Sequence, residues 1–361
     1  MSAKYIHIAD ELRAQILSIK NVKPQKLPTE QELCDKYHVS RQTIRSSLLL
    51  LEEEHLIHRI QGSGAYITPQ EEYIASKKIV LLLSEDSEYT YPGLISDVEA
   101  VLRTKNLRLT VSTMRSDVNI ERNILQQLLS ESISVLVVEA TRTVFSPNTD
   151  LYEKLQLQGT HILFIGSTPS LAHPANVISI DHAEGGRLLG NCLITQSLRS
   201  IYALLPDFID DAKERYLGLQ IAFREKGLPI PFENIYWYTN KQLQLLRAKK
   251  DTSFFLPLIR NQLTDCDAIF CYNDEIAYSL IKELTYAGIS VPEQVSVISF
   301  DNSYLCSISV PMITSVGLPF HEPGYSVGNA IVDLIFENST KNKTLPWELH
   351  LRGSVLSTNY S

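Results

Sequence analysis

The chain lacks the cysteine patterns that bind metals or build disulfide frameworks. Its 361 residues include five cysteines, and no two of them form a Cys-x-x-Cys pair. An odd number of cysteines without such a pair favours free, buried thiols in a reducing compartment. We therefore expect a cytoplasmic protein with no metal site and no cofactor.

Long apolar runs are missing as well. No uninterrupted run approaches the roughly 18–20 residues of a membrane span, so we expect no contact with a membrane. The first twenty residues include Lys4, Asp10, Glu11 and Arg13. These charges are incompatible with the apolar centre of a signal peptide.

The motifs of several enzyme classes are also absent. The sequence has no P-loop, no His-Glu-x-x-His and no Gly-x-Ser-x-Gly. Asp210 and Asp211 are adjacent in sequence, so they do not face each other as an acid/base pair. We expect no catalytic residue, although a sugar-binding enzyme stays the rival interpretation from another functional class.

Charge is shared unevenly along the chain. The whole sequence is 44% hydrophobic and 20% charged, which is typical of a soluble globular protein of two or three units. Residues 1–70 carry nine Lys or Arg against eight Asp or Glu, whereas residues 71–361 carry 24 against 33. A near-neutral head on an acidic body permits nucleic-acid contact only through the head.

The head has the pattern of a winged helix. Apolar spacing predicts a first helix over residues 5–19. A capping box of Thr29 and Glu32 begins a second helix, and Ser40 caps a third. Residues 56–68 then read as two short strands around a glycine-rich tip. Three helices followed by a hairpin predict a helix-turn-helix with a wing.

The third helix has polar and basic residues in its first turn, where a recognition helix meets the major groove. Arg41 and Arg45 lie one turn apart, and an arginine binds a guanine edge or a phosphate through two parallel hydrogen bonds. The simpler alternative is the solvated face of an amphipathic helix. The candidate DNA-binding residues are Ser40, Arg41, Gln42, Thr43 and Arg45 with the wing glycines Gly62 and Gly64.

The segment "LPTEQELCDKYHVSRQTIRSSLLLLEEEHLIHRIQGSGAYI" resembles the GntR-type winged-helix family over nearly its full length. The resemblance implies that residues 1–70 form a DNA-binding domain whose partner is double-stranded operator DNA. It also implies the DNA-facing positions named above. One position departs from the family: many members have Arg where this chain has Gln31, which removes one cationic contact.

Residues 71–78 are polar and aperiodic, so we expect a linker. Over residues 79–361, short apolar runs alternate with helical patterns, which predicts an α/β fold with parallel sheets covered on both faces. The number of runs suggests two sheets. Ligands of such folds lie beyond the carboxyl ends of the strands. Polar residues at these points include Glu139, Asn273 and Asp301.

The segment "CYNDEIAYSLIKELTYAGISVPEQVSVISFDN" is similar to the LacI/GalR effector domain. The resemblance implies two lobes of the periplasmic-binding-protein type, dimerisation through residues 79–361, and contacts of Arg215, Asn273 and Asp301 with ligand hydroxyls. Asn273 has the alternative role of a helix cap. In "SIDHAEGGRLLG", Asp181 and the glycines fit structural roles.

The combination of head and body resembles bacterial arabinose-responsive repressors, which implies a homodimer released from its operator by a small sugar, L-arabinose first. A sugar needs an aromatic face beside polar groups; Tyr89 and Tyr91 could supply it, as could Trp237. Leu318 stands where relatives commonly carry a polar residue, so one hydroxyl contact is expected to be lost. Another sugar, a nucleoside or a phosphosugar remains an alternative effector, and activation remains an alternative to repression.

Overall fold

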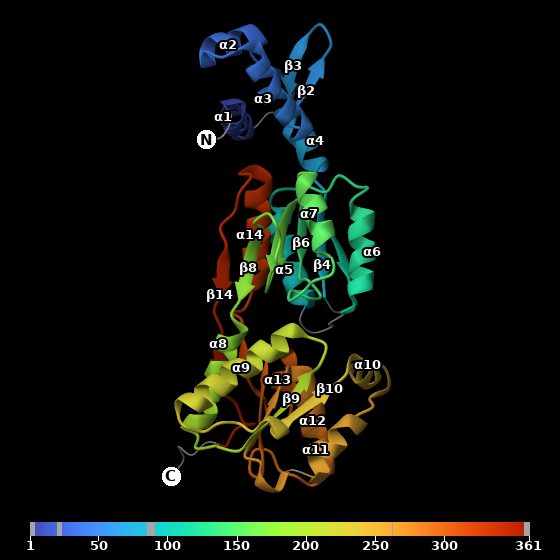
Figure 1. The fold of residues 1–361 in the computed structure, drawn as a ribbon, viewed down its shortest axis with the longest axis vertical. Coiled ribbons are helices and arrows are strands. Elements are labelled where there is room, and N and C mark those ends of the chain that lie inside the picture. The colour runs from blue at the N-terminus through green and yellow to red at the C-terminus, as the bar shows by residue number, and fades with distance from the viewer. Residues whose placement is uncertain (1–3, 20–23, 85–90, 262, 357–361) are drawn as a thin grey trace.

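The computed structural model of the chain describes residues 4–19, 24–84, 91–261 and 263–356. It stacks three bodies along its long axis, which we call the head, lobe 1 and lobe 2 (Figure 1). The head holds the N-terminal helices and a small sheet, and each lobe is built around a six-stranded sheet. This arrangement confirms the expected fold class, a winged helix-turn-helix joined to a two-lobed α/β body.

The head forms as its capping residues predict. The Thr29 hydroxyl accepts a hydrogen bond from the backbone N–H of Glu32, and the Glu32 carboxylate accepts one from the backbone N–H of Thr29. Ser40 caps the third helix. The three strands pair antiparallel in the order β1-β3-β2. The elements of the head are α1 (Lys4–Ser18), β1 (Gln25–Lys26), α2 (Glu30–Tyr37), α3 (Arg41–Glu53), β2 (Ile57–Ile60) and β3 (Gly64–Ile67).

The segment expected to be an aperiodic linker contains a short helix, α4 (Gln70–Ala75). Tyr73 is the reason: its ring is buried, and its hydroxyl donates to the carbonyl oxygen of Ile335 at 3.0 Å. Buried apolar side chains of the head, Tyr73 and one face of lobe 1 form a single cluster. The head therefore packs on lobe 1 and is not joined to it by a flexible linker alone.

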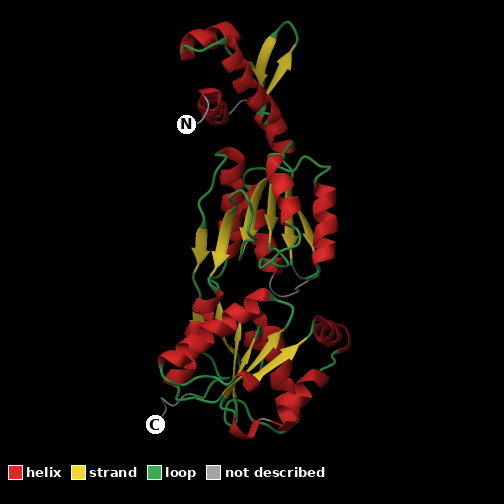
Figure 2. Ribbon diagram, in the orientation of Figure 1, coloured by secondary structure: helices red, strands yellow, loops and turns green. Residues whose placement is uncertain are grey.

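Lobe 1 is a fully parallel sheet in the order β14-β8-β7-β6-β4-β5 with helices on both faces (Figure 2). Its strands are β4 (Ile79–Leu83), β5 (Leu109–Thr113), β6 (Val135–Val138), β7 (His161–Ile165), β8 (Asn176–Ile180) and β14 (Lys343–Leu345). Its helices are α5 (Tyr91–Arg103), α6 (Val118–Leu128), α7 (Thr149–Leu157) and α14 (Glu322–Phe336).

Lobe 2 has the order β10-β9-β11-β12-β13-β15, parallel except for β15. Its strands are β9 (Ile201–Pro206), β10 (Ile235–Tyr238), β11 (Ala268–Cys271), β12 (Ser296–Phe300), β13 (Thr314–Gly317) and β15 (Glu348–His350). Its helices are α8 (His182–Thr195), α9 (Asp210–Glu225), α10 (Asn240–Lys249), α11 (Leu256–Asn261), α12 (Asp274–Tyr286) and α13 (Tyr304–Ile308).

The chain crosses between the lobes three times. It passes from β8 to α8 at Asp181, from β13 to α14 at residues 318–321, and from β14 to β15 at residues 346–347. A pair of lobes joined by three crossovers places the carboxyl ends of both sheets opposite one another. Within the described part of the chain, no helix combines the length and apolar character needed to cross a bilayer.

Candidate functional site

A cavity of about 480 Å³ lies between the two lobes. Residues that directly follow β4, β6 and β7 line it from lobe 1, and residues that follow β9, β11 and β12 line it from lobe 2. The second and third crossovers also contribute residues to its wall. This is the place where open α/β sheets bind ligands.

Glu139 is the carboxylate of the lobe 1 wall. Its Oε2 accepts hydrogen bonds from the backbone N and the hydroxyl of Ser84, at 3.1 and 2.6 Å, and from the hydroxyl of Tyr91. These bonds fix the carboxylate and the Tyr91 hydroxyl at the end of β6. Tyr89, the other tyrosine expected here, lies outside the described residues.

Arg215 is the cation of the lobe 2 wall. Its guanidinium carbon lies 4.5 Å from the ring centroids of both Tyr272 and Phe300. Its Nη1 donates to the carbonyl oxygen of Tyr272 at 2.9 Å and to Oδ1 of Asp301 at 3.3 Å. Because only 6% of Arg215 is exposed, these contacts leave the guanidinium in one orientation.

Two glycines allow this placement of Arg215. A Cβ atom on Gly186 of α8 would stand 1.9 Å from the carbonyl oxygen of Arg215, and one on Gly218 of α9 would stand 1.8 Å from that of Ala183. The helices α8 and α9 therefore touch backbone to backbone. That contact brings Arg215 to His182, whose Nδ1 accepts a hydrogen bond from Arg215 Nε at 3.4 Å.

Asp301 follows β12 with a φ of 97°, which an L residue rarely adopts. The backbone is held there because the Asp301 N–H donates to the carbonyl oxygen of Val316 at 2.8 Å. Burial raises the pKa of Asp301 to about 7, against the opposing effect of Arg215. Burial therefore disfavours the charged form of this carboxyl group, and the Arg215 guanidinium favours it.

Asn273 performs the capping role and also lines the cavity. Its Oδ1 accepts a hydrogen bond from the backbone N of Ile276 at 3.1 Å, and the residue belongs to the cavity wall. Behind it, the fully buried Asp274 accepts hydrogen bonds from Ser299, from Ser315 at 2.8 Å and from the Ser303 backbone at 2.6 Å. Asp274 thus ties the strand ends of lobe 2 together.

Sequence patterns did not indicate several residues of the cavity wall, and His182 and Trp347 are two of them. Burial lowers the pKa of His182 to about 4, although Asp211 favours the charged form. Trp347 donates through Nε1 to the carbonyl oxygen of Asp181 at 2.6 Å and so ties the first and third crossovers together. His182 lies two residues after the end of β8, close enough to the strand end that the same rule could have found it. Trp347 follows a three-residue strand that has no sequence signal.

Of two further residues named from the sequence, Leu318 lines the cavity and Trp237 does not. Leu318, in the second crossover, lines the cavity. The sequence analysis expected this leucine to stand where relatives commonly carry a polar residue that contacts the ligand. Trp237 lies on the edge strand β10 with 40% of its surface exposed, and it is outside the set of described residues that line the cavity.

The cavity wall is acidic. Among its described residues, one carries a guanidinium, Arg215, and six carry carboxyl groups. The wall therefore opposes a phosphorylated or carboxylated ligand, whereas neutral hydroxyl groups find many acceptors. The six are Asp97, Glu139, Asp210, Asp211, Glu214 and Asp301.

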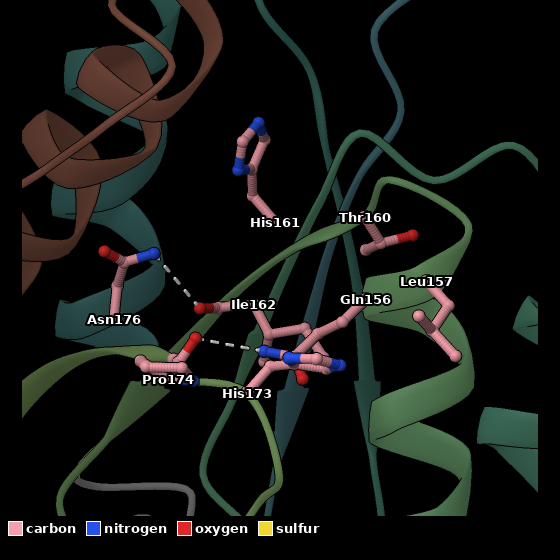
Figure 3. A pocket seen from close by; sticks show the side chains of 9 residues that line it. Gln156, Leu157, Thr160, His161, Ile162, His173, Pro174 and Asn176 are labelled. Carbon is pink, nitrogen blue, oxygen red and sulfur yellow. Dashed lines mark hydrogen bonds between the residues drawn. The ribbon is translucent and has the colours of Figure 1, made fainter. Parts of the chain in front are cut away.

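A second cavity, of about 350 Å³, lies in lobe 1 alone (Figure 3). Its amide groups are used internally: Gln156 Nε2 donates to the carbonyl oxygen of Pro174 and Asn176 Nδ2 to that of Ile162. Leu157 on its rim is 75% exposed. Because it lies in one lobe and the described residues of its wall include no carboxylate or guanidinium, this hollow is a weaker candidate than the cavity between the lobes.

The predicted DNA-facing residues of the head are exposed, except for Thr43, which is half-buried. Arg45 lies in α3 and its Nε donates to both oxygens of Glu30, at 3.1 and 3.0 Å. Arg41 donates to Gln31 at 2.7 Å. The wing tip carries Gly62 and Gly64 with φ values of 74° and 121°, which favour glycine. Ser40 and Thr43 bond to each other at the start of α3, and Gln42 is exposed beside them.

Two family profiles match the chain. Residues 4–67 match bacterial regulatory proteins of the gntR family, and residues 192–355 match the periplasmic binding protein-like domain. The chain carries a GntR-type helix-turn-helix domain in front of a periplasmic-binding-protein-like domain. These two matches agree with both family resemblances found in the sequence.

Curated relatives share this GntR and LacI-type combination over most of the chain. An arabinose metabolism transcriptional repressor from Geobacillus stearothermophilus is 26% identical over 93% of this chain and 92% of its own. One from Halalkalibacterium halodurans is 27% identical over 96% of this chain and 93% of its own. Both relatives are transcriptional regulators, in keeping with a GntR/LacI-type regulator that binds DNA.

Solved structures of LacI-type regulators share the fold of the body. A LacI family regulator from Enterococcus faecium with bound ribose superposes with a TM-score of 0.64 at 21% identity, covering 77% of this chain and 98% of its own. A periplasmic binding protein/LacI regulator from Alkaliphilus metalliredigens, complexed with D-xylulofuranose, gives a TM-score of 0.63 at 19% identity, covering 78% of this chain and 100% of its own.

Proposed function

We propose that this regulator represses sugar-utilisation genes and is released from operator DNA by a small neutral sugar, with L-arabinose as the first candidate. The observation that carries the proposal is the cavity between the lobes, which is lined by Arg215 and Asp301 from lobe 2 and by Glu139 from lobe 1. Sugar hydroxyls both donate and accept hydrogen bonds, and this wall offers partners of both kinds.

The effector-binding residues in this proposal are those of the sequence argument. Arg215 and Asn273 provide donors, while Glu139 and Asp301 provide acceptors. Tyr89 and Tyr91 provide the aromatic face. Residues 79–361 form the effector-binding and dimerisation domain, residues 71–78 connect it to the head, and residues 1–70 bind DNA.

The acidic wall supports a neutral sugar over a phosphosugar, because six carboxyl groups surround one guanidinium. The names of the two curated relatives support L-arabinose among the neutral sugars. Leu318 offers no hydrogen bond to a hydroxyl, so the sugar has one polar contact fewer on that side than a polar residue would give.

Repression and release follow from linkage between the two sites. A sugar that binds both walls favours one arrangement of the lobes, and the operator favours whichever arrangement sets the two heads at half-site spacing. A lone winged helix covers one half-site, so the proposal includes a homodimer on a palindromic operator.

A thermal-shift panel of L-arabinose, other pentoses, hexoses and one pentose phosphate tests the effector. A ligand at one hundred times its Kd stabilises the folded state by about 2.7 kcal/mol. We expect L-arabinose to raise the melting temperature and the pentose phosphate to leave it unchanged. A panel in which no neutral sugar shifts the transition contradicts the proposed effector class.

A further inference from the structure

The side-chain amide of Gln31 bridges two oppositely charged groups on the DNA-facing surface of the head. Its Nε2 donates to Oδ1 of Asp35, one helical turn along α2, at 2.9 Å. Its Oε1 accepts a hydrogen bond from Nη2 of Arg41, in the first turn of α3, at 2.7 Å. The three side chains form a chain of hydrogen bonds from α2 to the recognition helix.

An amide is the group that suits this position. It must donate toward a carboxylate on one side and accept from a guanidinium on the other, and an amide does both at once. A cationic side chain at position 31 would pair with Asp35 but would meet Arg41 as a like charge. A carboxylate would pair with Arg41 but would meet Asp35 as a like charge.

We infer that Gln31 is a positioning residue: it holds the Arg41 guanidinium in the orientation in which Arg41 binds the edge of one base. Gln31 thereby contributes to operator specificity and does not itself contact a phosphate. The inference rests on the proposed DNA-binding function. A held guanidinium loses less freedom when it binds a base by two hydrogen bonds. A released guanidinium on its flexible stem reaches the neighbouring phosphates as easily as the base, and phosphate contacts carry no sequence information.

The sequence comparison alone suggested a different role for this position. Gln31 replaces a cation that many related heads carry, so its expected effect was the loss of one contact. The geometry points to a gain instead: the missing charge is what allows Arg41 to lie beside α2 without repulsion.

The test compares operator DNA with scrambled DNA. Wild-type full-length protein first selects its operator from random duplexes. The affinities of Gln31→Ala, Gln31→Glu and the double variant Gln31→Glu/Asp35→Asn are then measured on the operator and on a scrambled duplex at several salt concentrations. Gln15→Ala is the matched control, because Gln15 makes a similar exposed bond to Glu11 at 3.1 Å on α1.

We expect Gln31→Ala to lower the ratio of operator to scrambled affinity by roughly 5- to 150-fold, the discrimination that one bidentate base contact provides. Its affinity for scrambled DNA and its salt slope should match the wild type. Gln31→Glu should lose specificity because Asp35 repels it, and Asp35→Asn should restore the ratio in the double variant. Gln15→Ala should behave as wild type.

Three results would overturn the inference. Gln31→Ala that weakens both duplexes equally and lowers the salt slope by about one unit identifies a phosphate contact. If Gln31→Ala binds both duplexes with wild-type affinity, Gln31 has no role in specificity. If the double variant has the same ratio of operator to scrambled affinity as Gln31→Glu, the hydrogen-bonded bridge from Asp35 to Arg41 does not determine specificity. Failure of the wild type to select any sequence instead overturns the proposed function itself.

Discussion

Arg215 and Asp301 form an ion pair in the wall of the interlobe cavity, with Nη1 3.3 Å from Oδ1. The pair joins helix α9 to the end of β12, and Asp211 lies 3.6 Å from the same guanidinium. Burying either charge alone would be costly. The pair therefore compensates two largely buried charges in the wall of the cavity.

The Asp301→Asn variant should separate sugar binding from DNA binding. Replacing one carboxylate oxygen with an NH2 donor leaves a sugar donor unpaired and should weaken sugar affinity by about 1–3 kcal/mol, while operator affinity stays at the wild-type value. Calorimetry measures the first and fluorescence anisotropy the second. Asp265→Asn, an exposed residue of the same lobe, is the control. Wild-type sugar affinity in Asp301→Asn would remove this residue from the site.

His182 should make the stability of the protein depend on pH between about 4 and 6.5. The folded state holds the pKa of this imidazole at about 4 against an ordinary 6.5, so in this window the unfolded chain binds a proton that the folded chain does not. The free energy of unfolding should fall as pH is lowered from 6.5 to 4, by up to about 3 kcal/mol, and this contribution should be constant below 4.

The His182→Asn variant isolates that contribution. Asparagine keeps an acceptor for Arg215 and does not titrate, so the difference in unfolding free energy between wild type and variant should shrink as the pH falls through the window. Denaturant unfolding at several pH values measures it. A difference that is independent of pH would show that this imidazole does not titrate as the structure implies.

The first turn of α3 should carry the DNA affinity of the head. Arg41→Ala should cost about 1–3 kcal/mol if the side chain contacts a base, and Arg45→Ala should cost a similar amount with a salt slope lower by about one unit if it contacts a phosphate. Gel-shift titration measures both. Arg103→Ala, on α5 of lobe 1 with 77% of its side chain exposed, should bind normally. Unchanged affinity in both head variants would contradict the assignment.

Tyr73 should transmit the state of the lobes to the head. It packs on the C-terminal end of α14 through Ile335, while residues 323 and 324 at the other end of α14 line the cavity. Lys77 lies over its ring at 4.0 Å and donates to the carbonyl oxygen of Glu54 in the head at 3.1 Å. Helix α14 therefore reaches from the interlobe cavity to Tyr73, and Lys77 links Tyr73 to the head.

The Tyr73→Ala variant should bind sugar alone and operator alone with wild-type affinity, but sugar should lower its operator affinity less than in the wild type. Coupling between two sites is typically 5- to 150-fold in affinity, and we expect this factor to approach one in the variant. The factor is the ratio of operator affinities with and without saturating sugar. Tyr286→Ala, which removes a 78% exposed tyrosine from lobe 2, serves as control. Full coupling in Tyr73→Ala would contradict this route.

Sequence patterns predicted the elements that carry strong local signals. The capping box at Thr29 and the Ser40 cap lie where expected, since these bonds are made within four residues. The buried run at β12 predicted a strand ending just before Asp301, because a parallel strand covered on both faces is uniformly apolar.

Other features depend on contacts distant in sequence. The short strands β14 and β15 pair with β8 and β13, more than thirty residues away, so Trp347 could not be placed in the cavity. Helix α4 forms because Tyr73 finds Ile335, 262 residues along the chain. The bridge of Gln31 to Arg41 joins two helices whose relative orientation no local pattern specifies.

Titration of L-arabinose, then of other pentoses, into a preformed complex of the full chain with fluorescent operator DNA tests the central claim most directly. The account predicts that anisotropy falls as sugar is added to the wild-type complex, and that Asp301→Asn needs a higher sugar concentration for the same release. A wild-type complex that stays intact at saturating concentrations of every sugar tested would contradict the account.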